Sequence, residues 1–336
     1  MTDSAIWCYV VKTRAVIVLR TESTLTLEIP ADPVFANIRP FLRWAGSKRK
    51  VIKHLLPFVP TRFDKYYEPF LGGGSLFFFL GPKRAEISDM SGMLIDTYLA
   101  VRNRPEEILD NLRPLKPNKT TYKQIKRAQP IDKADAASRI IFLNKACWNG
   151  LFRVNSAGEF NVPFGYPKSD FIIDEGNFRR CATQLRRREV SIRQQDFEEI
   201  EDRVCAGDFV FLDPPYVTSH NLNGFVDWNE CLFSWKDQVR LAKMAKRLAR
   251  RGANVLITNA NHADVRELYE GFIYSSFVRS STLASDKSRR VPTSEAIFLS
   301  GPAYATLRSK AVARGIRKNG RQGPVNSAER YLAKSR

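Results

Sequence analysis

Four consecutive residues, Asp213-Pro214-Pro215-Tyr216, bring together a carboxylate, a rigid turn and an aromatic ring. They follow the apolar run 209–212, which is typical of a buried strand, and two prolines cannot continue a sheet ladder. In open α/β sheets, ligands bind beyond the carboxyl ends of the strands. A carboxylate beside a fixed carbonyl can accept the N–H groups of a planar amine, and a tyrosine face can stack on a base. The alternative is a strand that ends in a purely structural turn.

A glycine-rich turn lies between an expected strand and an expected apolar helix, in the segment Tyr67-Glu68-Pro69-Phe70-Leu71-Gly72-Gly73-Gly74-Ser75. Glycines let a backbone approach a ligand closely, but the segment matches neither the Walker loop nor the dinucleotide spacing. Asp89 ends the next expected strand, where a carboxylate commonly binds ribose hydroxyls. The pattern predicts a nucleoside-like cofactor such as S-adenosylmethionine; a tight structural turn is the alternative.

An aromatic residue and a cation flank a tight turn further upstream, at Trp44 and Lys48. Lys48 could neutralise a cofactor carboxylate, and Trp44 could form a wall beside an adenine or a methionine group. A core tryptophan with a surface lysine is the alternative reading.

The composition points to a polyanionic partner. The 336 residues carry a formal net charge of +19 and a pI near 9.9, and such a charge favours binding to phosphates. Residues 303–336 contain nine Lys or Arg and one Glu, so we expect a flexible basic tail that anchors nonspecifically on phosphates. The remaining 302 residues are also basic, so the charge is not confined to the tail.

The five cysteines contain no C-x-x-C pair and the three histidines are isolated in sequence. Neither a disulfide framework nor a metal site is therefore expected. No stretch approaches the roughly 18 apolar residues of a membrane span. We expect a cytoplasmic protein that is a monomer or a weak dimer.

Strands alternating with helices predict an α/β fold with a largely parallel, doubly wound sheet. Expected strands are 64–68, 85–89, 209–212 and 254–258; expected helices are 75–80, 93–102, 135–144 and one that begins with the capping box Ser234-x-x-Asp237. Residues 1–38 are assigned no function and could be an appended hairpin or a poorly folded leader. We predict a catalytic domain from 39–104 plus 184–302, an inserted domain at 105–183 and the tail at 303–336.

The chain resembles the Dam-type DNA adenine-N6 methyltransferases, and the matching blocks follow in the same order from about Phe41 to Leu299. Four blocks carry the resemblance: Trp44 to Lys48, Glu68 to Ser75, Asn149-Gly150-Leu151-Phe152-Arg153 through Gly158 to Gly165, and Asp213 to Tyr216. The resemblance implies a class I S-adenosylmethionine-dependent methyltransferase fold with a Rossmann-like sheet and a helical target-recognition insertion. It also implies double-stranded DNA as partner and a bacterial or phage origin.

The resemblance implies roles for individual residues. Asp213, Pro214 and Tyr216 would be catalytic. Cofactor contacts would fall on Trp44, Lys48, Glu68, Phe70, Gly72, Gly74, Asp89 and Asp213. DNA contacts would fall on Arg43, Trp148, Asn149, Leu151, Arg153, Asn161 and Pro163, with Arg153 at a base-reading position.

Two positions depart from the family pattern. Ser47 replaces a usual glycine, and Tyr166 follows Gly165 where the family has an arginine that helps to read its site. An RNA adenine methyltransferase and a catalytically inactive DNA-binding protein of the same fold are the alternative functions. A cytosine-N4 enzyme is disfavoured, because those enzymes usually carry serine in place of Asp213.

Overall fold

The computed structural model describes residues 7–11, 14–19, 25–29, 38–44, 46–155, 159–168, 172–217, 233–280 and 292–305. Most of the predicted basic tail therefore lies outside the described residues. Tyr304, at the start of that segment, is buried, and its hydroxyl donates to the Phe58 carbonyl at 2.9 Å. The ordered core thus extends to the end of the described chain.

A seven-stranded sheet forms the centre of the molecule, in the order β6-β5-β4-β7-β8-β10-β9. The strands β6, β5, β4, β7 and β8 run parallel, whereas β10 pairs antiparallel with β8 and with β9. Their bounds are β4 Tyr66–Glu68, β5 Ala85–Asp89, β6 Val190–Gln194, β7 Phe209–Leu212, β8 Asn254–Ala260, β9 Ile273–Ser280 and β10 Pro292–Ser300. This is the predicted doubly wound arrangement with an antiparallel edge.

The amino-terminal segment contributes a separate three-stranded antiparallel sheet in the order β1-β2-β3. The strands are β1 Trp7–Val11, β2 Arg14–Leu19 and β3 Leu25–Ile29. They form a meander of the appended-hairpin kind that the sequence allowed.

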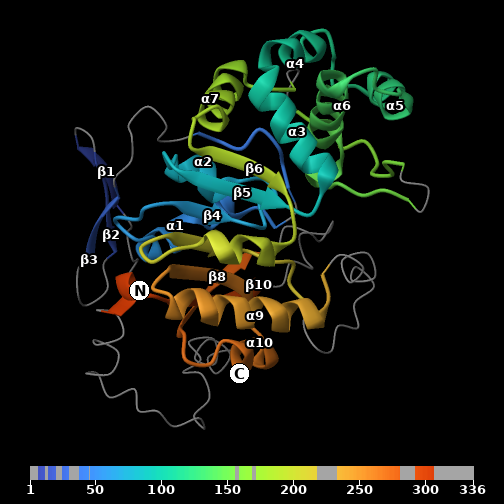
Figure 1. Ribbon diagram of the computed structural model, residues 1–336. Helices are drawn as coiled ribbons and strands as arrows, with labels where there is room; N and C mark the ends of the chain where they lie inside the picture. Colours follow the sequence, from blue (N-terminus) through green and yellow to red (C-terminus); the bar gives the residue numbers. More distant parts are fainter. Residues whose placement is uncertain are drawn as a thin grey trace, which may run out of the picture.

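Helices cover both faces of the central sheet (Figure 1). Their bounds are α1 Ile52–Leu55, α2 Ser75–Leu80, α3 Gly92–Asn103, α4 Pro105–Leu112, α5 Lys119–Arg127, α6 Lys133–Ala146, α7 Glu175–Leu185, α9 Trp235–Arg250 and α10 Ala263–Leu268. Short 3-10 turns are η1 Lys48–Lys50, η2 Leu56–Phe58, η3 Trp148–Gly150, η4 Phe197–Arg203 and η6 Pro302–Tyr304. Figure 1 shows α3 to α7 gathered beyond β5 and β6, with α9 and α10 on the opposite side of the sheet.

Alternating side chains along each strand build two hydrophobic clusters, one on each face of the sheet. Tyr66 and Phe209 belong to the cluster that continues into α2, α3 and α6, whereas Tyr67 and Val210 belong to the cluster under α9. The first cluster runs without interruption from the sheet into the helices of the 105–183 segment. One continuous hydrophobic core therefore joins that segment to the central sheet.

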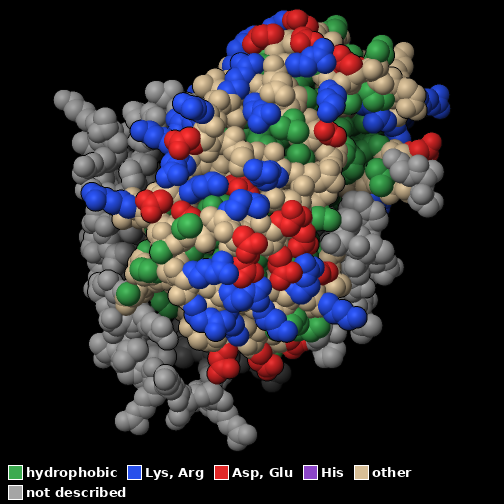
Figure 2. Space-filling view, in the orientation of Figure 1, with side chains coloured by type: hydrophobic (Ala, Val, Ile, Leu, Met, Phe, Trp, Pro, Cys, Tyr) green, Lys and Arg blue, Asp and Glu red, His purple; other side chains and the backbone are tan. Residues whose placement is uncertain are grey.

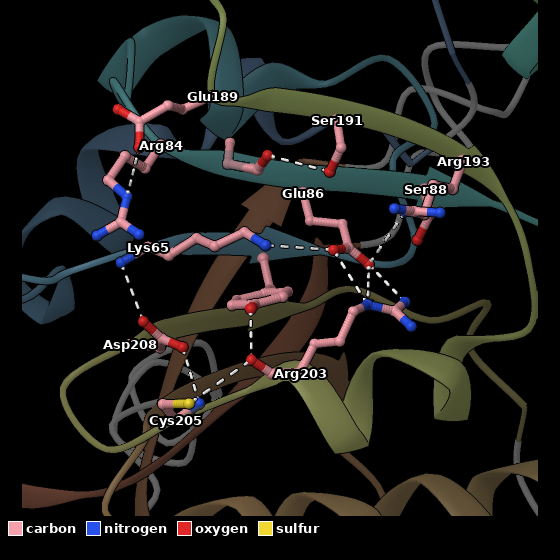
Figure 3. A network of polar contacts seen from close by, with 12 residues as sticks. Lys65, Arg84, Glu86, Ser88, Glu189, Ser191, Arg193, Arg203, Cys205 and Asp208 are labelled. Carbon is pink, nitrogen blue, oxygen red and sulfur yellow. Dashed lines mark hydrogen bonds and ion pairs between the residues drawn. The ribbon is translucent and has the colours of Figure 1, made fainter.

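A buried carboxylate, Glu86, ties β4, β5 and η4 together on the α9 side of the sheet (Figure 3). Glu86 is 1% exposed and contacts Arg203 at 2.6 Å and Lys65 at 3.3 Å. Burial alone would raise the pKa of Glu86, but hydrogen bonds from Arg203 and Gln195 and the charge of Lys65 bring it below its ordinary value. The network holds β5 to η4 and to the residue that precedes β4, on the α9 side of the sheet.

The basic face of α9 is largely paired within the fold. Arg240 contacts Glu198 at 2.7 Å and Arg247 contacts Glu201 at 2.6 Å, both across to η4. Figure 2 shows the resulting mixture of basic and acidic side chains over this region. We conclude that these arginines hold α9 against η4.

Candidate active site

The two chemically interesting loops meet at one place on the sheet. Strands β4 and β7 are neighbours; the chain leaves β4 toward β5 on one side, and it leaves β7 toward β8 on the other. The strand order therefore reverses between β4 and β7, and ligands bind at such switch points in open α/β sheets. The glycine-rich loop follows β4, and the Asp213-Pro214-Pro215-Tyr216 turn follows β7.

Asp213 is held by two donors from separate parts of the chain. Lys48 Nζ lies 2.7 Å from Asp213 Oδ1, with only 4% of the lysine side chain and 17% of the aspartate exposed. Thr258 Oγ1, on β8, donates to the same oxygen at 2.6 Å. An ion pair this poorly solvated costs desolvation energy, and the hydrogen bond from Thr258 helps to offset it. Within the described residues, both of these contacts use Oδ1, so Oδ2 is the oxygen that can accept from a ligand.

Lys48 therefore lies beside the Asp213 carboxylate. The sequence suggested that it neutralises a cofactor carboxylate, whereas the structure pairs its ammonium with Asp213 and also directs it to the Gly46 carbonyl at 3.1 Å. A contact with a cofactor stays a prediction.

The Tyr216 ring is fixed at both its hydroxyl and its face. The hydroxyl contacts Glu295 Oε2 at 3.1 Å, and Lys48 Nζ lies 4.9 Å from the ring centroid. Pro214 and Pro215 restrict the preceding backbone. The ring is therefore a rigid platform next to the Asp213 carboxylate.

The glycine loop is shaped by Asp89 and covered by Trp44. The Gly72 N–H donates to Asp89 Oδ2 and the Ser91 N–H to Asp89 Oδ1, each at 3.0 Å. Gly72 has a φ of +46°, and a Cβ there would lie 2.8 Å from Trp44 Cδ1. The structure therefore brings Trp44, Gly72 and Asp89 together, as the sequence predicted. Burial raises the pKa of Asp89, although the backbone donors oppose this shift.

Glu68, at the end of β4, is a second buried acid in the site. It is 3% exposed, and its Oε2 accepts the Tyr66 hydroxyl at 2.9 Å. Burial raises the pKa of Glu68 to about 8; the Tyr66 bond opposes the shift and the nearby Asp213 adds to it. A carboxylate in this position would be stabilised by a positively charged ligand. Phe70, in the glycine loop, packs on the α9 side against Phe197, at a ring separation of 5.4 Å.

The predicted DNA-contacting residues form one surface. Asn144 of α6 holds two of its segments together by hydrogen bonds to their backbones. The Arg43 N–H donates to Asn144 Oδ1 at 2.8 Å, and Asn144 Nδ2 donates to the Arg43 carbonyl at 2.6 Å and to the Gly150 carbonyl at 3.1 Å. The loop also closes on itself, because the Trp148 N–H donates to the Pro163 carbonyl at 2.9 Å. Asparagine can satisfy three such backbone groups at once because its amide both donates and accepts.

Several side chains on this surface point to solvent. Arg43, Asn149, Arg153 and Pro163 are exposed, while Trp148, Leu151 and Asn161 are half-buried. Arg153 Nε donates to Asn161 Oδ1 at 2.8 Å, and the Asn161 N–H donates to the Arg153 carbonyl at 3.0 Å.

The DNA-contacting surface is joined to the glycine loop through aromatic packing. Trp44, which covers Gly72, is stacked on Phe152 with centroids 6.0 Å apart and planes at 14°. Phe152 lies in the same loop as Leu151 and Arg153. The predicted cofactor and DNA regions are therefore adjacent.

The sequence reasoning missed three residues that position the site: Asn144, Thr258 and Glu295. Thr258 and Glu295 lie on neighbouring strands β8 and β10, on the sheet face that also carries Glu68. A polar residue inside an otherwise apolar strand was the available signal for both. Their partners are 45 and 79 residues away in the chain, so these hydrogen bonds could be recognised only in the folded structure.

Metal and membrane features are absent from the described part of the chain. Its His, Cys, Asp and Glu side chains form no group of three or more that could hold a metal ion. None of the helices in the described ranges is long and apolar enough to cross a membrane.

A mostly parallel sheet with a glycine loop and an acid at its switch point defines a class I methyltransferase fold. The comparisons agree, because the model of the D12 class N6 adenine-specific DNA methyltransferases matches residues 44–282. The chain belongs to this family, as its motifs indicated.

Named relatives cover most of the chain. The sequence is 32% identical over 269 residues to Type II methyltransferase M1.LlaDCHI of Lactococcus lactis subsp. cremoris, which covers 78% of this chain and 95% of the relative. It is 34% identical over 260 residues to Type II methyltransferase M.MjaIII of Methanocaldococcus jannaschii, covering 70% and 89%. It is also 27% identical over 271 residues to a DNA adenine methylase of Haemophilus influenzae, covering 78% and 94%.

Proposed function

We propose that the protein transfers a methyl group from S-adenosylmethionine to the N6 amino nitrogen of an adenine in duplex DNA. The observation that carries this proposal is the Asp213 carboxylate, held at the switch point by Lys48 and Thr258 through one oxygen. Its other oxygen can accept an N–H from a planar amine. Family membership gives the same reaction class.

The amine must be activated because its lone pair is delocalised into the purine ring. Asp213 Oδ2 and the Pro214 carbonyl would each accept one N–H of the adenine amino group. These two acceptors would favour a pyramidal nitrogen whose lone pair is free to attack. Holding both reactants in place supplies much of the acceleration in reactions of this kind.

The adenine must leave the duplex to reach this position. Extrusion costs a few kcal/mol of unstacking and unpairing, and stacking on the fixed Tyr216 ring would return part of it. No covalent intermediate with the protein is required, because the amino nitrogen attacks the methyl carbon directly. The N–C bond forms as the C–S bond breaks, S-adenosylhomocysteine leaves as the neutral thioether, and the alkylated nitrogen releases one proton.

The residues around the glycine loop suit the methyl donor, which is a substrate consumed in each turnover. S-adenosylmethionine supplies an electrophilic methyl group on a positively charged sulfur. Gly72 and Gly74 would allow close approach of the donor, Asp89 would accept ribose hydroxyls through its remaining lone pairs, and Trp44 would form one wall. Glu68 is a buried acid suited to a nearby positive charge. Phe70 and Lys48 complete this predicted set.

The DNA surface from Arg43 to the Arg153 loop would lie against the duplex. Arg153 is exposed and oriented by Asn161, which favours a contact with a base edge in the major groove. A bidentate pair of this kind is worth about 1–3 kcal/mol of discrimination. Arg153→Ala should then relax specificity at one base pair, whereas a phosphate contact would weaken all sequences alike.

The experiment that tests the function is methylome sequencing of DNA exposed to the purified protein. N6-methyladenine within a defined motif supports the proposal. Methylation of an RNA pool but not of duplex DNA, or methylation of cytosine, would refute it. Deleting residues 306–336 tests the predicted tail separately, since a phosphate anchor should reduce the slope of log affinity against log salt.

A further inference from the structure

The most unusual acid in the molecule is Glu295, on β10. Its side chain is 0% exposed, and the residues that follow it, Ala296 to Leu299, are buried and apolar. β10 pairs with a strand on each side, so Glu295 lies opposite Ala260 of β8 and Phe277 of β9. Burying a carboxylate in the middle of a sheet is costly unless it is hydrogen-bonded, and an apolar residue would pack there without that cost.

Glu295 is hydrogen-bonded to Tyr216, the last residue of the Asp213-Pro214-Pro215-Tyr216 turn. Glu295 Oε2 lies 3.1 Å from the Tyr216 hydroxyl, across 79 residues of sequence. Burial, and then the nearby Asp213 and Glu295 carboxylates, raise the pKa of the Tyr216 hydroxyl. The hydroxyl therefore stays protonated and donates to Glu295 Oε2.

We propose that Glu295 is a positioning residue for methyl transfer, which holds the Tyr216 ring in place through its hydroxyl so that the extruded adenine stacks in reach of Asp213. This inference rests on the proposed function. Glu295 acts through Tyr216 and is assigned no contact with the adenine. Fixing the ring in advance lowers the ordering cost on binding.

The same strand pair positions both halves of the motif. Thr258 on β8 donates to Asp213, and Glu295 on the neighbouring β10 accepts from Tyr216. Thr258 lies opposite Ile297, two residues beyond Glu295, so both groups are on one face of the sheet. The Asp213 carboxylate and the Tyr216 ring are therefore both held by the β8–β10 strand pair.

The test is a double-mutant cycle on Glu295→Leu and Tyr216→Phe. The readouts are the single-turnover rate of methyl transfer on the duplex identified by methylome sequencing, the fluorescence of 2-aminopurine at the target position and the thermal midpoint. Each single variant should slow transfer about 10- to 100-fold, the factor that corresponds to losing a hydrogen bond to a charged group. The double variant should be no slower than either single variant, because both remove the same bond.

Two further variants complete the design. Glu295→Gln keeps an acceptor for the hydroxyl and should retain the rate within about threefold, and Glu270→Gln, at an exposed acid, should match the wild type. The 2-aminopurine signal should change in Tyr216→Phe and Glu295→Leu but not in Glu295→Gln. A merely structural role would lower the thermal midpoint without changing this signal.

The outcomes separate the two proposals. Losses that multiply in the double variant, or wild-type rates in Tyr216→Phe, would overturn the role of Glu295. If Glu295→Leu does not fold, a slow Glu295→Gln beside a fast Tyr216→Phe would overturn it equally. Absence of adenine methylation by the wild-type protein would instead refute the proposed function itself.

Discussion

Glu68 gives a prediction that can be worked through from its surroundings. The side chain is 3% exposed, and burial raises its pKa from 4.5 to about 8. A raised pKa means that the folded state binds the proton more tightly than the unfolded state. The stabilisation is therefore fully present below pH 4.5 and is lost as the pH rises through about 8.

The magnitude follows from the two pKa values. The rise corresponds to about 5 kcal/mol, at about 1.4 kcal/mol per pH unit. In Glu68→Gln the side chain cannot ionise, so this dependence should disappear. The free energy of unfolding of the wild type relative to Glu68→Gln should fall by about 5 kcal/mol between pH 4.5 and pH 8.

The assay is urea unfolding of both proteins at intervals from pH 4.5 to 9, without S-adenosylmethionine, with the exposed-site variant Glu270→Gln as control. Parallel stability curves for the wild type and Glu68→Gln would contradict the reasoning, because they would mean that Glu68 titrates normally. A positively charged ligand beside Glu68 should favour its ionised form. Binding of S-adenosylmethionine at pH 7 should therefore release a proton, which calorimetry in buffers of different ionisation enthalpy detects.

Three further predictions follow from single contacts. Gly72→Ala places a Cβ at 2.8 Å from Trp44 Cδ1 in a left-handed backbone; steady-state kinetics should show a raised KM for S-adenosylmethionine, and an unchanged KM would argue against the loop as the donor site. Thr258→Val removes a 2.6 Å bond to the catalytic acid and should slow single-turnover transfer about tenfold; a wild-type rate would show that the bond is dispensable. Glu86→Gln leaves Arg203 without its carboxylate and should lower the unfolding free energy at pH 7 by about 3 kcal/mol; since the pKa of Glu86 is lowered from 4.5 in the folded state, the difference should be lost as the pH falls through that lowered pKa, and a difference that persists in acid would contradict the assignment.

Local signals predicted much of the catalytic half. The strand at Ala85–Asp89 and the helix at Ser75–Leu80 have the expected bounds, and the capping box at Ser234 starts α9 with both of its hydrogen bonds formed. Each of these elements is specified by neighbouring residues, through apolar runs or an N-cap. The family motifs then placed the loops correctly between them.

Elements with weaker local signals escaped the sequence reasoning. No individual helix was predicted within residues 105–132, which are rich in proline and lysine, yet they form α4 and α5. Pro105 occupies the first turn of α4, where its missing N–H costs nothing, and Asn118 caps α5. Strands β9 and β10 were also missed, because a long antiparallel pair is decided by contacts with the rest of the sheet.

The candidate site shows most clearly which contacts the sequence could not predict. The sequence identified Asp213 and Tyr216 but not the groups that hold them, because those groups come from strands that only the sheet order brings alongside. It likewise predicted a cofactor contact for Lys48 but not the ion pair with Asp213, which the fold forms at 2.7 Å. Contacts between distant segments depend on topology, which residue spacing does not encode.

The central claim is that the Asp213 carboxylate binds and activates the adenine amino group, and the direct measurement is single-turnover methyl transfer by Asp213→Ala. Its matched control, Asp213→Asn, keeps the size but loses the charge. Methyl transfer in Asp213→Ala should fall by on the order of 10³-fold. The Kd for duplex DNA, measured by fluorescence anisotropy, should stay within about threefold of wild type, because the proposal gives this side chain a contact with the extruded base and none with the phosphate backbone. A rate near wild type in Asp213→Ala, with the variant folded and bound to DNA, would contradict the account.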